Sequence, residues 1–132
     1  MTVSRLRVRF RTAFLATALL LAALPAFAAP SNKWRIQCSE GAKSAGELVF
    51  AFTPEGAATF EVTVPVADGT SENGVARTIR DAFRTKLDGA KFKVEVDDGE
   101  DVLVKKKGRQ PDFDLKLVSN SVEAVRILLD RE

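Results

Sequence analysis

Few side chains in this sequence could perform chemistry, and the most reactive of them is the single cysteine. Cys38 could act as a nucleophile only as a thiolate, and a nearby histidine usually removes the proton. The chain contains no histidine and no tyrosine. Cys38 also alternates with Trp34 and Ile36 on the apolar side of a predicted strand. We expect Cys38 to be a buried apolar residue, with an intermolecular disulfide as the alternative.

Carboxylates gather at two places where they could bind a cation or transfer protons. Four of them lie within residues 97–101, but a short hairpin sends alternate side chains to opposite faces, and the spacing is not that of an EF-hand loop. We expect a solvated hairpin tip there. Asp112 and Asp114 alternate with apolar residues, so both are predicted on the solvated face of a strand, as a weak acid–base pair. No catalytic residue, metal site or cofactor is predicted.

Basic side chains form two groups that could contact an anion such as a phosphate or lipopolysaccharide. The first group recurs on one face of a predicted helix, and the second is a lysine run. The six residues are Arg77, Arg80, Arg84, Lys105, Lys106 and Lys107. The alternative is an exposed helix face, on which Asp81 pairs with Arg77 at a spacing of four, and a charged edge strand that discourages aggregation.

The first 28 residues have the three zones of a secretory signal peptide. Four arginines precede an apolar stretch at 13–24, and a small-x-small site follows. We expect cleavage after Ala28, with Ala26 and Ala28 as the small residues and Ala29 as the new N-terminus. The alternative is an uncleaved anchor, but the apolar run is shorter than the roughly 20 residues that span a membrane. The chain is therefore predicted to be exported, to the periplasm or beyond the cell, without stable membrane insertion after cleavage.

Removal of the signal leaves residues 29–132, which we expect to form a single domain. Four of the 20 basic residues leave with the signal, so 16 basic residues remain against 18 acidic ones. The net charge of a chain this close to neutral does not predict binding to nucleic acid or to an anionic membrane. Because one cysteine cannot form an internal disulfide, stability has to come from an apolar core.

Six segments alternate apolar and polar residues with a period of two, which is typical of half-buried strands. They are 33–38, 47–53, 59–66, 91–97, 101–106 and 112–118. Between the third and fourth segments, Val75, Ile79 and Phe83 recur at a spacing of four, which predicts one amphipathic helix over about 71–87. The segment 122–131 fits either a seventh strand or a second helix, and its β-branched residues favour the strand.

These elements predict an α+β fold: a mostly antiparallel sheet of six or seven strands with one amphipathic helix packed on one face. A helix is about 10 Å wide and strands lie about 4.8 Å apart, so one helix covers only two or three strands. We therefore expect the sheet to curl strongly around the helix, unless the C-terminal segment supplies a second helix.

Residues 68–83 (DGTSENGVARTIRDAF) and 94–106 (VEVDDGEDVLVKK) resemble a group of small exported proteins of Gram-negative bacteria that have no assigned activity. This resemblance covers most of 33–132 and implies export and a shared fold, without catalytic or binding residues. The succession of helix and hairpin is also similar to modules of bacteriophage structural proteins. That second similarity concerns the fold, and a fold does not set function.

Together these patterns favour a non-catalytic binding or assembly module of the periplasm or extracellular space. Its partner would be a protein or an envelope component, contacted through a sheet edge or a charged face. The alternative is a small exported inhibitor of a protease or a cell-wall hydrolase, which would present the loop at 40–46 or the tip at 97–101. An enzyme is not expected, because it would have to use carboxylates, arginine and lysine alone.

Overall fold

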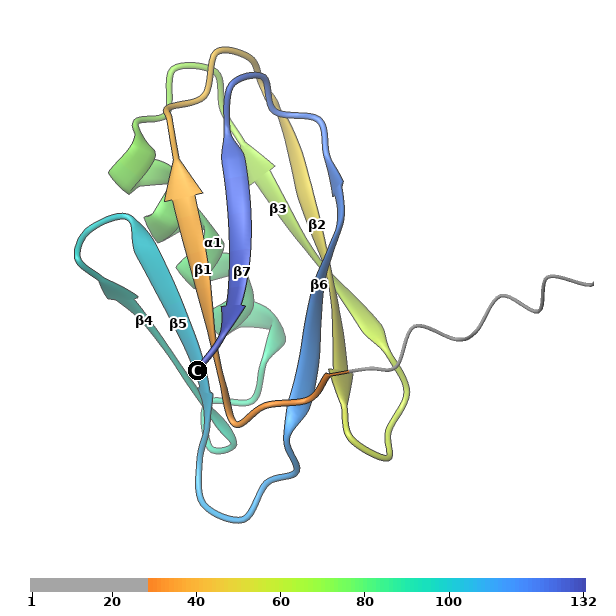
Figure 1. The fold of residues 1–132 in the computed structure, drawn as a ribbon. Coiled ribbons are helices and arrows are strands. Elements are labelled where there is room, and N and C mark those ends of the chain that lie inside the picture. The colour runs from red at the N-terminus through yellow and green to blue at the C-terminus, as the bar shows by residue number, and fades with distance from the viewer. Residues whose placement is uncertain (1–28) are drawn as a thin grey trace, which may run out of the picture.

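The computed structural model describes residues 29–132, which form seven strands and one helix (Figure 1). In chain order the elements are β1 (Lys33–Ser39), β2 (Gly46–Pro54), β3 (Phe60–Val66), α1 (Glu72–Lys86), β4 (Phe92–Asp97), β5 (Asp101–Lys106), β6 (Phe113–Asn120) and β7 (Arg126–Arg131). The predicted α+β class, antiparallel pairing and C-terminal strand are confirmed. The predicted signal peptide, with Ala26 and Ala28, lies outside the described residues.

The strands divide into two sheets, so the expectation of one curled sheet is wrong. One sheet has the order β4-β5-β1-β7 and the other has the order β3-β2-β6. Within residues 29–132, no ladder of hydrogen bonds joins the edge strands β6 and β7. The inner faces of both sheets bury their apolar residues in a common core. Packing one sheet on the other buries the strands that a single helix cannot cover.

Helix α1 packs against β3 and β4, which are edge strands of different sheets (Figure 1). Val75, Ile79 and Phe83 on its inner face are buried, as their spacing predicts. Ser71 is the N-cap, and its hydroxyl accepts a hydrogen bond of 3.1 Å from the Gly74 N–H. Leu87 is the C-cap. Among the described residues, no helix is long and apolar enough to cross a membrane.

A buried hydrogen bond between β1 and β6 connects the two sheets. The indole Nε1 of Trp34 on β1 donates to the carbonyl oxygen of Phe113 on β6 at 2.8 Å. The backbone of Phe113 also exchanges hydrogen bonds with Ser31, at 2.9 and 3.0 Å. The segment that leads into β1 therefore lies beside the first residue of β6 and covers its open edge there.

An aromatic cluster fills the core near the end of α1. Phe52 stacks on Phe113 and Phe60, with centroids 4.6 and 5.1 Å away, and meets Phe92 edge-on at 5.2 Å. Phe52 and Phe113 are fully buried, whereas Phe60 and Phe92 are half-buried. Because Phe60 and Phe92 are the first residues of β3 and β4, their rings reach the surface at the ends of these strands.

Candidate functional site

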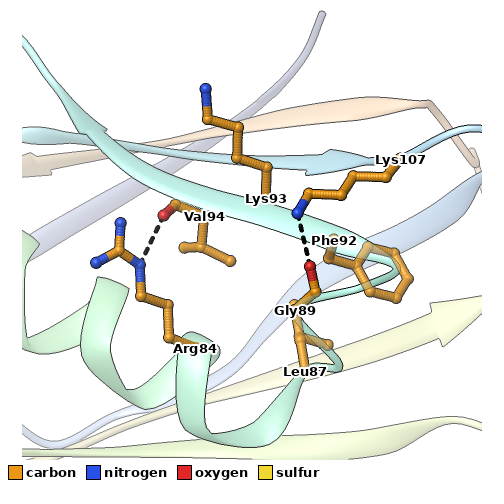
Figure 2. Close-up of a pocket in the computed structure, with 7 residues that line it drawn as sticks. All are labelled: Arg84, Leu87, Gly89, Phe92, Lys93, Val94 and Lys107. Carbon is orange, nitrogen blue, oxygen red and sulfur yellow. Dashed lines mark hydrogen bonds between the residues drawn. The ribbon is translucent and has the colours of Figure 1, made fainter.

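A pocket of about 350 Å³ opens between the last turn of α1 and β4 (Figure 2). Its lining residues are Arg84, Leu87, Gly89, Phe92, Lys93, Val94 and Lys107. Three of these side chains are cations, and the apolar ones form the floor. Such a combination suits an anionic group that is held against an apolar surface.

Backbone carbonyls hold two of the cations in place. The Nε of Arg84 donates to the carbonyl oxygen of Val94 at 2.8 Å, and the ammonium of Lys107 donates to that of Gly89 at 2.6 Å (Figure 2). Figure 2 shows the terminal nitrogens of Arg84 outside these bonds, with Lys93 extending away from α1. Both anchored side chains keep N–H donors that a ligand could use.

A second pocket, of about 370 Å³, adjoins the first and shares Leu87 and Phe92 with it. Its lining residues are Pro54, Ala57, Phe60, Lys86, Leu87, Asp88, Lys91, Phe92, Gln110 and Pro111. The backbone N–H of Lys107 donates to the carbonyl oxygen of Lys91 at 2.8 Å, so these two lysines connect the pockets. We call the two pockets together the basic groove.

The basic groove carries an excess of positive charge. Its lining contains five cations and one carboxylate, Asp88, which accepts the Ala90 N–H at 2.9 Å. Lys93 forms an ion pair with Glu95 at 3.1 Å. The other four groove cations form no ion pair within residues 29–132: Arg84, Lys86, Lys91 and Lys107. An anion that enters the groove would meet a net positive field, because Asp88 and Glu95 offset only part of the charge of the five cations.

Three lysines lie in register on the outer face of the four-stranded sheet, beside the groove. Lys105 on β5 is paired with Lys33 on β1 and with Lys93 on β4. Lys33 binds Glu132 at 2.6 Å, but in the described part of the chain Lys105 has no carboxylate partner. Like charges directly opposite each other destabilise a sheet. An anion bound near Lys93 would relieve this repulsion.

We expect Lys105→Gln to raise the free energy of unfolding by about 0.2–1 kcal/mol, because it removes the central charge of the row. Urea denaturation at low ionic strength would measure the gain, and about 1 M salt should abolish it by screening. Lys43→Gln, at an exposed position of the loop between β1 and β2, is the control and should give no gain. A loss of stability in Lys105→Gln would contradict the repulsion.

The groove unites only two of the six cations that the sequence singles out. Arg84 and Lys107 line it together, although they are far apart in the sequence. Lys106 instead binds Asp112 at 2.6 Å, and Lys105 lies in the lysine row.

The two remaining arginines stay on the helix surface. The predicted pair between Asp81 and Arg77 is wrong, because the adjacent Arg80 holds the Asp81 carboxylate at 2.9 Å. Arg77 is exposed and lines neither pocket of the groove.

Sequence patterns missed the other half of the groove. The alternation of apolar and polar residues places Phe60 and Phe92 on core faces and Lys91 on a solvated face, and Lys86 was not singled out, so nothing in the periodicity joins these four residues. One feature of the sequence could have indicated these rings. Each phenylalanine lies at the start of a strand, where neighbouring strands no longer cover the whole side chain.

The acidic hairpin tip is only partly solvated. Asp97 and Asp101 accept hydrogen bonds from the Arg35 guanidinium at 3.0 and 2.9 Å. Glu100 faces Glu72 from the first turn of α1, and this hydrogen-bonded contact between two carboxyl groups raises the pKa of Glu100. Among residues 29–132, no group of three or more acidic or cysteine side chains is placed to hold a metal ion.

The remaining candidates for chemistry are separated from one another. Cys38 is buried, as predicted, and burial raises the pKa of its thiol to about 12. The prediction that Asp114 lies on a solvated face is wrong. Asp114 is only 5% exposed, because Ser31 and β2 flank the start of β6. Lys116 lies 3.6 Å from Asp114, whereas Asp112 binds Lys106, so the two carboxylates do not form a pair.

The basic groove is therefore the candidate functional site, since it brings cations and half-buried aromatic rings together. Its residues come from the end of β2, the β2–β3 turn, the start of β3, the end of α1, the α1–β4 loop, β4 and the β5–β6 loop. Comparison of the chain with protein-family models, with curated proteins and with solved structures found no match.

Proposed function

We propose that this protein is an exported, non-catalytic binding module that holds a phosphate-like anionic group of an envelope component in the basic groove. The observation that carries the proposal is the set of four groove cations without a carboxylate partner within residues 29–132. Arg84 and Lys107 are fixed by backbone carbonyls, so little side-chain entropy is lost when they bind an anion.

The chemistry of the lining supports binding rather than catalysis. A nucleophilic mechanism needs an activated side chain beside a base. The groove instead offers cations and apolar side chains, and Asp88 is engaged by a backbone N–H. Export is proposed on the pattern of residues 1–28, and the near-neutral net charge agrees with a site that is confined to one end of the molecule.

The proposal is tested with methyl phosphate, which carries the anionic group without an apolar chain. We expect titration at low ionic strength to shift the amide NMR signals of residues 84–94 and 107. Lys91→Gln/Lys107→Gln should weaken binding about tenfold, since each charged hydrogen bond contributes about 0.5–1 kcal/mol at an exposed site. Glutamine at position 107 removes the charge and keeps an N–H donor, on a side chain that is one atom shorter.

The matched control is Lys43→Gln/Arg126→Gln, which removes the same charge from exposed positions outside the groove. It should bind methyl phosphate within about twofold of the parent. Equal weakening in both double variants would mean that net charge alone attracts the anion, and the proposal would fall.

A further inference from the structure

We propose that the ligand of the basic groove is an anionic amphiphile, whose apolar chain lies over Phe60 and Phe92 in the second pocket. This inference rests on the proposed function and adds the class of ligand. A phosphate alone would use the cations of the groove but would leave its aromatic side uncovered.

The second pocket is built mainly from apolar residues. Six of its ten lining residues are apolar: Pro54, Ala57, Phe60, Leu87, Phe92 and Pro111. Phe60 and Phe92 are the half-buried members of the aromatic cluster, whereas Phe52 and Phe113 are fully buried. An alkyl chain on this surface would remove further aromatic area from water, which is the main source of affinity for apolar ligands.

The shape of this apolar surface is set before any ligand binds. Phe60 stacks on Phe52 at 5.1 Å, and Phe92 meets both Phe52 and Phe113 edge-on at 5.2 and 5.6 Å. Pro54 and Pro111 restrict the backbone on either side. A preformed surface loses little entropy on binding, so the affinity should reflect the apolar area that the chain covers.

The positions of the charges argue for an anionic head on the same molecule. The ammonium of Lys86 lies 5.9 Å from the centre of the Phe60 ring, and Lys91 lines the same pocket. The first pocket, with Arg84 and Lys107, begins where Leu87 and Phe92 are shared. One molecule can therefore place its chain on the rings and its head among the cations.

A series of alkyl phosphates, used below their micelle-forming concentrations, tests the inference by calorimetry. From methyl to butyl, hexyl and octyl phosphate, we expect affinity to rise about fourfold for each methylene group buried, until the pocket is full. Octyl glucoside, with the same chain and a neutral head, should bind at least tenfold more weakly than octyl phosphate.

Two alanines of one turn provide a matched pair of variants. Ala57 lines the second pocket, whereas Ala58 lines neither pocket, and both are exposed. Ala57→Glu places a charged side chain in the path of the alkyl chain and should weaken octyl phosphate by at least tenfold. Ala58→Glu adds the same charge and should leave octyl phosphate binding within about threefold of the parent.

The outcomes separate the inference from the proposed function. If methyl and octyl phosphate bind equally well, and binding still depends on Lys91 and Lys107, the proposal of an amphiphilic ligand is overturned. The proposal of an anion-binding site is then supported. If neither phosphate binds, both proposals are overturned. Equal binding of octyl glucoside and octyl phosphate would overturn the claim that the head of the ligand is anionic. Equal effects of Ala57→Glu and Ala58→Glu would overturn the claim that its chain lies in the second pocket.

Discussion

Replacement of Phe52 by alanine is expected to lower the free energy of unfolding by about 3–5 kcal/mol. Phe52 is fully buried at the centre of the aromatic cluster, where it contacts the rings of Phe60, Phe92 and Phe113. The substitution would leave a cavity between rigid neighbours that cannot all move inward. Urea denaturation measures the loss, because the midpoint should fall without a large change in slope.

The control for this cavity is Phe52→Met, which keeps most of the volume and should cost about 1.5 kcal/mol or less. If the two variants were equally unstable, loss of aromatic contact rather than loss of volume would be the cause. Because Phe52 supports Phe60 and Phe92, Phe52→Ala should also weaken octyl phosphate binding where the protein is still folded. A fully stable Phe52→Ala would contradict the packing described above.

Replacement of Arg35 by glutamine is expected to cost about 2 kcal/mol at neutral pH, as hydrogen bonds to charged groups contribute more than neutral ones. The Arg35 guanidinium binds Asp97, Asp101 and Glu132, and only 19% of its side chain is exposed. These three carboxylates raise the pKa of Arg35 above its ordinary value. Without Arg35 they would repel one another across β4, β5 and the C-terminal residue.

The same cluster predicts how stability depends on pH. Hydrogen bonds from Arg35 and Lys33 lower the pKa of Glu132 below its ordinary 4.5. Its stabilising contribution is therefore present above about pH 4.5 and is lost as the pH falls through the lowered value. The parent should lose stability on acidification below this range, whereas Arg35→Gln should lose less, because Glu132 no longer has the Arg35 hydrogen bond that its protonation would remove.

Denaturation midpoints at neutral pH and at about pH 3.5 measure both effects of Arg35→Gln. Arg126→Gln, an exposed arginine outside any ion pair of the described residues, is the control and should follow the parent at both values. Parallel pH profiles for the parent and Arg35→Gln would show that the cluster does not couple protonation to folding.

Local patterns were sufficient to predict the elements, because each depends on residues that are close in the sequence. Alternation of apolar and polar residues located the strands, and a spacing of four located α1, whose caps are Ser71 and Leu87. The division into two sheets depends instead on strands far apart: β1 pairs with β5 and β7, not with β2. No periodicity within one segment carries that information.

The candidate site was predicted only in part for the same reason. Arg84 and Lys107 stood out as members of charged groups, but their partners Lys86, Lys91, Phe60 and Phe92 belong to segments that only the tertiary fold brings together. The near-neutral net charge of residues 29–132 also gave no indication of a positively charged groove. Net charge counts every acidic and basic residue, wherever it lies in the fold. Many of the acids that balance the groove lysines lie elsewhere, such as Asp97 and Asp101, which bind Arg35.

The way in which the chain alternates between the two sheets has a consequence for the speed of folding. Four of the six connections between consecutive strands cross from one sheet to the other. The central strands β1 and β2 each require a neighbour from the second half of the chain, so neither sheet can be completed early. Topologies rich in such distant pairings fold in milliseconds to seconds. That delay suits a chain that is proposed to cross a membrane unfolded, since the native state would form only after the last strand has emerged.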